Sequence, residues 1–199
     1  MVRRRVLLTT IVASVLGFGG PASAIWLSET GSVATLTGPF VMGDDAVFKA
    51  FLEKPRPQPL KILYLSSGGG KVGPAVAIGR MVRRAGLATV VDADAAACSS
   101  ACTLVFVAGV RRHYVNGDHV AEGMSARNGL GFHPAHRAGG RRDGNTHSEK
   151  ATERIRRYFA EMGAPRAAEL MDKAAFNSFY RPNGQTALAL HIATSLSAP

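Results

Sequence analysis

The 199-residue sequence has only two cysteines, one tryptophan and 14 acidic residues against 24 basic ones. Two cysteines without adjacent histidines cannot fill a tetrahedral shell, so we expect no metal site. The P-loop pattern G-x-x-x-x-G-K-[ST] is absent, and we expect no cofactor. The remaining composition, 46% apolar and 19% charged, is typical of one globular domain rather than of a disordered chain.

Long hydrophobic runs are also absent, except at the start of the chain. Three arginines (residues 3–5) precede an uncharged apolar stretch over 6–20, and Ala22-Ser23-Ala24 follows. This order is typical of a secretory signal peptide with cleavage after Ala24. A membrane anchor is the alternative, but the stretch is shorter than the ~20 residues that a span needs. We expect a signal peptide over 1–24, a single domain over 25–199, and a periplasmic or secreted protein.

The formal net charge of +10 raises the question of an anionic partner. One basic cluster, over 136–142, has no aromatic residues interleaved, and no nucleic-acid-binding motif is present. The cluster is more typical of a solvated loop, and we expect no nucleic-acid partner.

Apolar patterns and turn residues predict strands that alternate with helices. We expect strands over 32–37, 60–65, 87–91, 110–115 and 129–134, and helices over 44–52, 72–84, 149–162 and 165–175, with a further helix that ends at Gly109. Such alternation predicts an α/β fold with mainly parallel strands and right-handed crossovers.

The stretch from Ala95 to Gly109 holds small residues followed by an apolar run. Ser99, Ser100 or Thr103 could cap the helix that starts here, which would then pack into the core. A serine at a helix start, beside free amide N–H groups, could instead be a nucleophile. The pattern alone favours the packed core helix, because short apolar runs usually belong to the core.

Cys98 and Cys102 lie on either side of that serine pair. On one ideal helix their Cα atoms would be about 6 Å apart, within the range of a disulfide. An exported chain meets an oxidising compartment, so the pair is a disulfide candidate that would fix the backbone around Ser99 and Ser100. Two reduced, buried thiols are the alternative.

A triple glycine, Gly68-Gly69-Gly70, follows the strand over 60–65 and precedes a helix. Such a loop can bind phosphate, or its amides can face a reacting carbonyl.

Three segments together resemble the ClpP/crotonase superfamily, and in particular the proteolytic subunit of the Clp peptidase. Leu63-Tyr-Leu-Ser-Ser-Gly-Gly-Gly70 is similar to the strand and Asn-Ser-Pro-Gly-Gly loop of that family. The segment 98–109 matches its Ala-Ala-Ser-Met-Gly-Ala stretch, and Gly131-Phe-His-Pro134 resembles its Ile-His-Gln-Pro. The resemblance covers about residues 32–194, with the nearest likeness to small exported ClpP-like proteins. It implies a spiral of ββα units with mainly parallel sheets and C-terminal helices.

The resemblance also implies a set of catalytic residues. Ser100 would be the nucleophile, His133 the base, and the amides of Gly69 and Ala101 the oxyanion hole. This agrees with chemistry, because a serine hydroxyl needs a base to take its proton. The family's third member, an aspartate, has its nearest match in Asp172, although its register departs from the family pattern. Asn177 lies closer when counted back from the C-terminal helix.

The implied function is an exported serine hydrolase, peptidase-like and independent of ATP, acting on a peptide or protein substrate. An exported chain would have access to neither ATP nor the unfoldase partner of the Clp peptidase. Because ClpP-like folds commonly assemble into oligomers, the resemblance also implies a homo-oligomer. A non-catalytic module that binds a peptide or an envelope partner is the alternative. A crotonase-like acyl-CoA enzyme would use the same oxyanion architecture, but it would need coenzyme A, which an exported protein does not meet.

Overall fold

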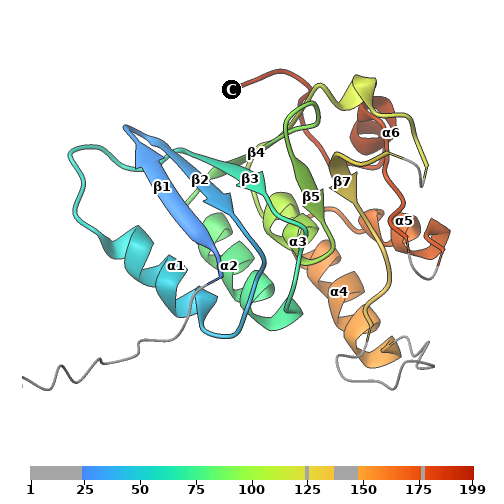
Figure 1. The fold of residues 1–199 in the computed structure, drawn as a ribbon, viewed down its shortest axis with the longest axis horizontal. Coiled ribbons are helices and arrows are strands. Elements are labelled where there is room, and N and C mark those ends of the chain that lie inside the picture. Colours follow the sequence, from blue (N-terminus) through green and yellow to red (C-terminus); the bar gives the residue numbers. More distant parts are fainter. Residues whose placement is uncertain (1–23, 124–125, 137–147, 176–177) are drawn as a thin grey trace, which may run out of the picture.

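The computed structural model describes residues 24–123, 126–136, 148–175 and 178–199, which form alternating strands and helices (Figure 1). In chain order the elements are β1 (Trp26–Thr30), β2 (Val33–Thr37), α1 (Asp44–Glu53), β3 (Ile62–Ser66), α2 (Val72–Arg84), β4 (Ala88–Asp92), β5 (Ala97–Ser99), α3 (Ala101–Val107), β6 (Arg112–Val115), the 3-10 turn η1 (Gly117–His119), β7 (Gly129–Gly131), α4 (Glu149–Glu161), α5 (Ala167–Lys173) and α6 (Gly184–Ala189).

Two sheets carry the fold. The larger has the strand order β1-β2-β3-β4-β6, in which β1 is antiparallel to β2 and every other pair is parallel. The smaller consists of β5 and β7, which are also parallel. A bridge between Ser67 and Cys98 joins the end of β3 to β5, so the two sheets meet where β3 ends. The expected α/β fold with mainly parallel strands is confirmed.

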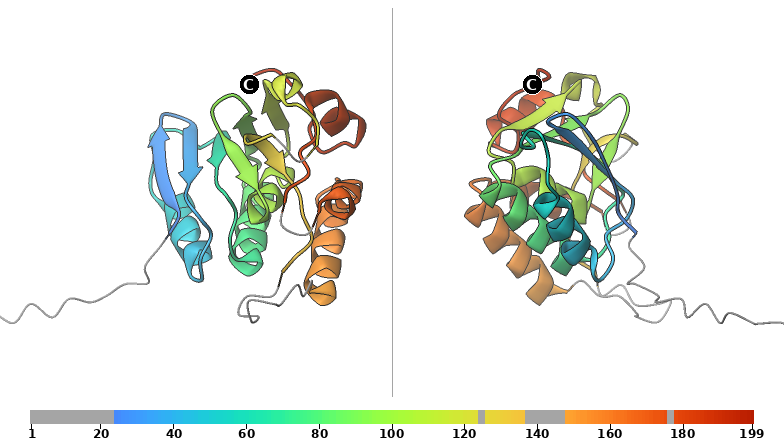
Figure 2. Two further views of the ribbon diagram at one scale, coloured as in Figure 1. Left: turned by 45° about the vertical axis from the view of Figure 1, so that its right-hand side comes forward. Right: turned by 90° about the vertical axis from the view of Figure 1, so that its left-hand side faces the viewer.

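Helices α1 to α4 gather on one side of the larger sheet (Figure 2). In α2 the buried residues recur at helical spacing, which buries one face: Ala75, Val76, Ile78, Gly79 and Val82. All seven residues of α3 are buried, so this helix runs through the core between the sheets and the neighbouring helices. The start of α3 is therefore anchored in the core.

The sequence patterns did not indicate two of the strands. β1 is an edge strand whose outward residues are exposed, Trp26 to 75%, so it lacks a strong apolar alternation. It pairs with β2 through a tight turn at Gly31, which has a φ of 60°. β5 is only three residues long, and it depends on hydrogen bonds with β7, which starts 32 residues after it does, and with Ser67 at the end of β3. Local patterns do not carry such information.

The predicted signal peptide lies almost wholly outside the described residues, which begin at Ala24. Within the described ranges, no helix has the length and apolar character that crossing a bilayer requires. The export of the chain remains a prediction.

Packing between α2 and α4 gives a test of the core. A Cβ at Gly79 would lie 1.9 Å from the hydroxyl of Tyr158, which is buried and donates to the Leu104 carbonyl at 3.1 Å. We expect Gly79→Ala to lower the free energy of unfolding by about 1–3 kcal/mol, because the tyrosine must shift and its hydrogen bond is lost. Chemical denaturation measures this.

The matched control is Gly73→Ala in the same helix, where an added Cβ meets nothing within 4 Å. This variant should be as stable as the wild type or slightly more so, because alanine favours a helix. Equal stability of the two variants would contradict the packing described for Gly79.

Candidate active site

Ser100 is the single residue that connects the end of β5 to the start of α3. It has a φ of 55° and a ψ of −125°, a conformation that costs a non-glycine residue about 1–3 kcal/mol and is concentrated at functional sites. Its backbone is held from both sides: its N–H donates to the Gly131 carbonyl at 2.8 Å, and its own carbonyl accepts the Thr103 N–H at 3.0 Å and the Thr103 hydroxyl at 2.7 Å. The residue occupies the N-cap position, yet its side chain makes no capping bond.

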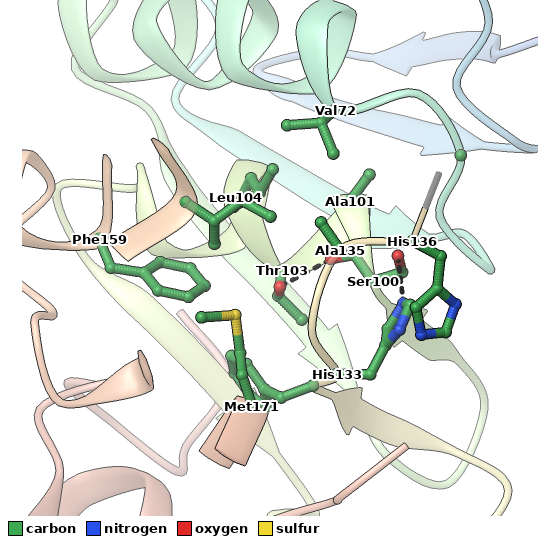
Figure 3. Close-up of a pocket in the computed structure, with 13 residues that line it drawn as sticks. Val72, Ser100, Ala101, Thr103, Leu104, His133, Ala135, His136, Phe159 and Met171 are labelled. Atoms are coloured by element: carbon green, nitrogen blue, oxygen red, sulfur yellow. Dashed lines mark hydrogen bonds between the residues drawn. The ribbon is translucent and has the colours of Figure 1, made fainter. Parts of the chain in front are cut away.

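The hydroxyl of Ser100 is engaged with His133 instead. The distance from Ser100 Oγ to His133 Nε2 is 2.7 Å, and both residues are half-buried (Figure 3). His133 follows β7 by two residues, and β7 pairs with β5, so the small sheet itself brings the serine and the imidazole together. The imidazole ring packs edge-on against the rings of Phe179, at 4.9 Å between centroids, and His136, at 4.8 Å.

The glycine loop approaches the serine closely. Gly69 has a φ of 107°, and a Cβ there would lie 2.6 Å from Ser100 Cβ. Its N–H, which the resemblance implies as an oxyanion donor, donates to Ser67 Oγ at 3.1 Å. Ser67 is buried, which makes this bond costly to break.

Two other amides are better placed as donors. Gly70 lines the same cavity as Ser100, and its N–H has no acceptor among the described residues. Ala101 is the first residue of α3, where the N–H has no preceding helical turn to donate to. Phe40 pairs with both sides of the loop, because its N–H donates to the Gly69 carbonyl at 2.8 Å and its carbonyl accepts the Lys71 N–H at 2.8 Å.

Cys98 and Cys102 form a disulfide with an S–S distance of 2.07 Å and Cα atoms 5.1 Å apart. The two cysteines do not lie on one helix as the spacing argument assumed. Cys98 belongs to β5 and Cys102 to the first turn of α3, so the bridge spans the strand-to-helix turn that holds Ser100. Both residues are fully buried.

Asp172 does not meet the imidazole. Its carboxylate accepts a hydrogen bond from Arg156 on α4 at 2.6 Å, and its side chain is 55% exposed. The helix α5 thus presents this acid to solvent and to α4 rather than to His133. Asn177, the other residue considered, lies outside the described residues, as does the basic cluster beyond His136.

The cavity beside Ser100 has a volume of about 150 Å³ (Figure 3). Helices α2 to α5 and the segment after β7 supply its largely apolar lining, which includes Val72, Leu104, Phe132, Ile155, Phe159 and Met171. Within the described part of the chain, no group of three or more histidine, cysteine or acidic residues is placed to hold a metal ion.

No family model and no curated protein matches the sequence. Among solved structures, the chain is similar to a variant of the membrane-bound stomatin-specific protease 1510-N, with a TM-score of 0.58 and 14% identity over 83% of this chain and 78% of that one. A second variant of this protease, in complex with a substrate peptide, gives 0.56 and 12% over 83% and 74%. A Streptomyces avermitilis protein assigned as an enoyl-CoA hydratase gives 0.50 and 12% over 87% and 67%.

These likenesses define the fold class. The chain has the α/β fold of the ClpP/crotonase type, which the proteases and the hydratase share. At 12–14% identity this likeness shows the fold alone. The chemistry of the site depends on this chain's own residues.

The approach of the glycine loop to the serine generates a prediction. Gly69→Ala would place a Cβ 2.6 Å from Ser100 Cβ and 2.7 Å from the Ser99 carbonyl, at a φ that alanine rarely adopts. We expect the substitution to lower the free energy of unfolding by about 1–3 kcal/mol and to slow phosphonylation of Ser100 by a fluorophosphonate probe. Gly68→Ala is the control, because a Cβ there meets nothing within 4 Å. Equal behaviour of the two variants would contradict the close approach.

Proposed function

We propose that the protein is a serine hydrolase that cleaves peptide bonds, with Ser100 as nucleophile and His133 as general base. The observation that carries this proposal is the 2.7 Å contact between Ser100 Oγ and His133 Nε2 at the edge of an open cavity. A capping role for Ser100 does not account for it, since the side chain makes no capping bond. A strained serine between a strand and a helix is a recurrent setting for a nucleophile.

The reaction follows from the geometry. His133 takes the hydroxyl proton on Nε2 while Ser100 Oγ bonds to the carbonyl carbon of the substrate. The tetrahedral intermediate collapses when the imidazolium returns that proton to the leaving amine, which departs and leaves an acyl-serine. Water, activated by the same imidazole, then adds to the ester carbonyl and releases the acid and the free serine.

The negative charge of the intermediate needs N–H donors beside Ser100. We assign this role to the amides of Ala101 and Gly70, in place of Gly69, whose N–H already donates to Ser67. The backbone already holds such donors in position before the reaction begins, so stabilising the developing charge requires no reorganisation.

The cavity supports a preference for apolar substrate side chains. Its lining includes leucine, isoleucine, phenylalanine and methionine side chains. Burying an apolar substrate side chain against them, next to the scissile bond, would make the free energy of binding more favourable. A charged side chain would lose its hydration there without a partner. The likeness to a protease whose variant binds a substrate peptide supports a peptide substrate for this chain as well.

Export and assembly belong to the same proposal. The basic, apolar and small-residue order of residues 1–24 supports export to the periplasm or beyond, and the buried disulfide fits an oxidising compartment. In that setting the hydrolase works without ATP or an unfoldase. We further propose that it assembles as a homo-oligomer, as its resemblance to the Clp peptidase implies.

The experiment uses a fluorophosphonate probe and peptide substrates on the purified chain. Wild-type protein should be labelled on Ser100, and Ser100→Ala should not be labelled. His133→Gln should slow labelling and peptide hydrolysis by about 100- to 10,000-fold, because the hydroxyl loses its general base. Peptides with leucine or phenylalanine before the scissile bond should be cleaved faster than those with aspartate.

Folded wild-type protein that is neither labelled nor active on any peptide would contradict the hydrolase. Binding of peptides without turnover, unchanged in Ser100→Ala, would instead favour the non-catalytic module.

A further inference from the structure

A short segment after α5, residues 178–182, pairs with the chain segment that carries His133, and we call it the strap. Its backbone pairs with the chain in two places: Tyr180 exchanges two hydrogen bonds of 2.9 Å with Phe132, and Arg181 exchanges bonds of 2.8 and 3.0 Å with Gly123. Phe132 directly precedes the base His133. The strap thus holds the segment that carries the imidazole.

The side chain of Arg181 points from the strap to the nucleophile's strand. Its Nη2 donates to Ser99 Oγ at 2.9 Å, directly before Ser100, while Nη1 donates to the Gly129 carbonyl of β7 at 2.8 Å and Nε to the Ala126 carbonyl at 2.8 Å. One rigid guanidinium therefore bonds to both strands of the small sheet. β5 leads into the serine and β7 leads into the histidine.

The small sheet leaves space for this group. A Cβ at Gly131 would lie 2.7 Å from Arg181 Nη1 and 2.9 Å from Ser99 Oγ, so a larger residue would push the guanidinium from the position it holds. Gly131 is also the residue whose carbonyl accepts the Ser100 N–H. The guanidinium thus fills the space directly behind the backbone of the catalytic pair.

Arg181 is 5% exposed and has no carboxylate partner among the described residues. Burial lowers the pKa of its guanidinium. Desolvating a charge is unfavourable, and a sheet with two strands could be packed by apolar side chains at less cost. What a guanidinium adds is fixed geometry, because its planar donors hold three acceptors in set directions.

We propose that Arg181 is a positioning residue that fixes the distance between Ser100 and His133 by tying β5 and β7 to one planar group. The proposal rests on the hydrolase function argued above. It does not give Arg181 contact with the substrate, and it predicts an effect on the rate of acylation rather than on substrate binding.

Arg112 offers a matched control. It is 8% exposed, its guanidinium also bonds to backbone carbonyls, those of Ile192 at 2.8 Å and His191 at 2.9 Å, and burial lowers its pKa as well. It holds the C-terminal segment and contacts neither strand of the small sheet. If the labelling rate and kcat fall only because a buried arginine is removed, they should therefore fall in both Arg181→Met and Arg112→Met.

The experiment compares Arg181→Met and Arg112→Met with the wild type in thermal unfolding, fluorophosphonate labelling and peptide hydrolysis, at a temperature where all three are folded. Both variants should unfold at lower temperature. Only Arg181→Met should lose labelling rate and kcat, by about 100-fold, with KM nearly unchanged, because a displacement of about 1 Å between reacting groups has that effect. Equal rates in the two variants would overturn the proposal.

Two milder variants decide the question if Arg181→Met does not fold. Ser99→Ala removes one acceptor of the guanidinium, and Arg181→Lys keeps the charge but cannot hold three acceptors in a plane. Both variants should be folded, and the probe should label Ser100 more slowly in each than in the wild type. The labelling rate should be lower in Arg181→Lys than in Ser99→Ala. Wild-type rates in both would show that the bonds of Arg181 do not position the pair.

Failure of the hydrolase function is distinguished by a readout that needs no turnover. The ¹⁵N chemical shifts of the His133 imidazole report its hydrogen bond to Ser100 in the folded protein. Arg181→Met should change these shifts and Arg112→Met should not, whether or not the wild type reacts with the probe. Unlabelled wild type together with this shift pattern would reject the hydrolase and keep the positioning role.

Discussion

The geometry of the site depends on one constraint: the backbone of Ser100 is held in a conformation that residues with a side chain rarely adopt. Hydrogen bonds to Gly131 and Thr103 fix its backbone, and the disulfide joins the strand before it to the helix after it. The glycine loop can come close only because Gly69 lacks a side chain. Each of these contacts comes from a different part of the chain, so the serine's orientation is a product of the whole fold rather than of its local sequence.

Much of the fold could be predicted from periodicity. The buried face of α2 and the parallel strands β3, β4 and β6 follow patterns that a short window contains. β1 and β5 were missed for a physical reason: an exposed edge strand lacks alternation, and a three-residue strand owes its existence to a partner far along the chain. Long-range hydrogen bonds leave no local mark in the sequence.

The site divides in the same way. The resemblance to the ClpP/crotonase superfamily implies that Ser100 and His133 meet, and in the structure Ser100 Oγ lies 2.7 Å from His133 Nε2. The resemblance implies the Gly69 amide as an oxyanion donor, but the sequence does not show that this N–H donates to Ser67 Oγ, which is why we propose Gly70 instead. The resemblance implies Asp172 as the nearest acid, but its exposed carboxylate accepts a hydrogen bond from Arg156 on α4, a contact that the sequence does not reveal. Arg181 belongs to no sequence motif. Its proposed positioning role rests on the hydrogen bonds that its buried guanidinium donates to Ser99 and Gly129.

The close fit between Gly131 and Arg181 has a consequence for how such chains diverge. A Cβ at position 131 would lie 2.7 Å from Arg181 Nη1, so a side chain there would displace the guanidinium from its acceptors and the two positions are coupled. A descendant that gained alanine at 131 would have to shift or replace the arginine and find other donors for the carbonyls it held. Covariation between these two positions, fifty residues apart in the chain, is the evolutionary trace that this packing should leave.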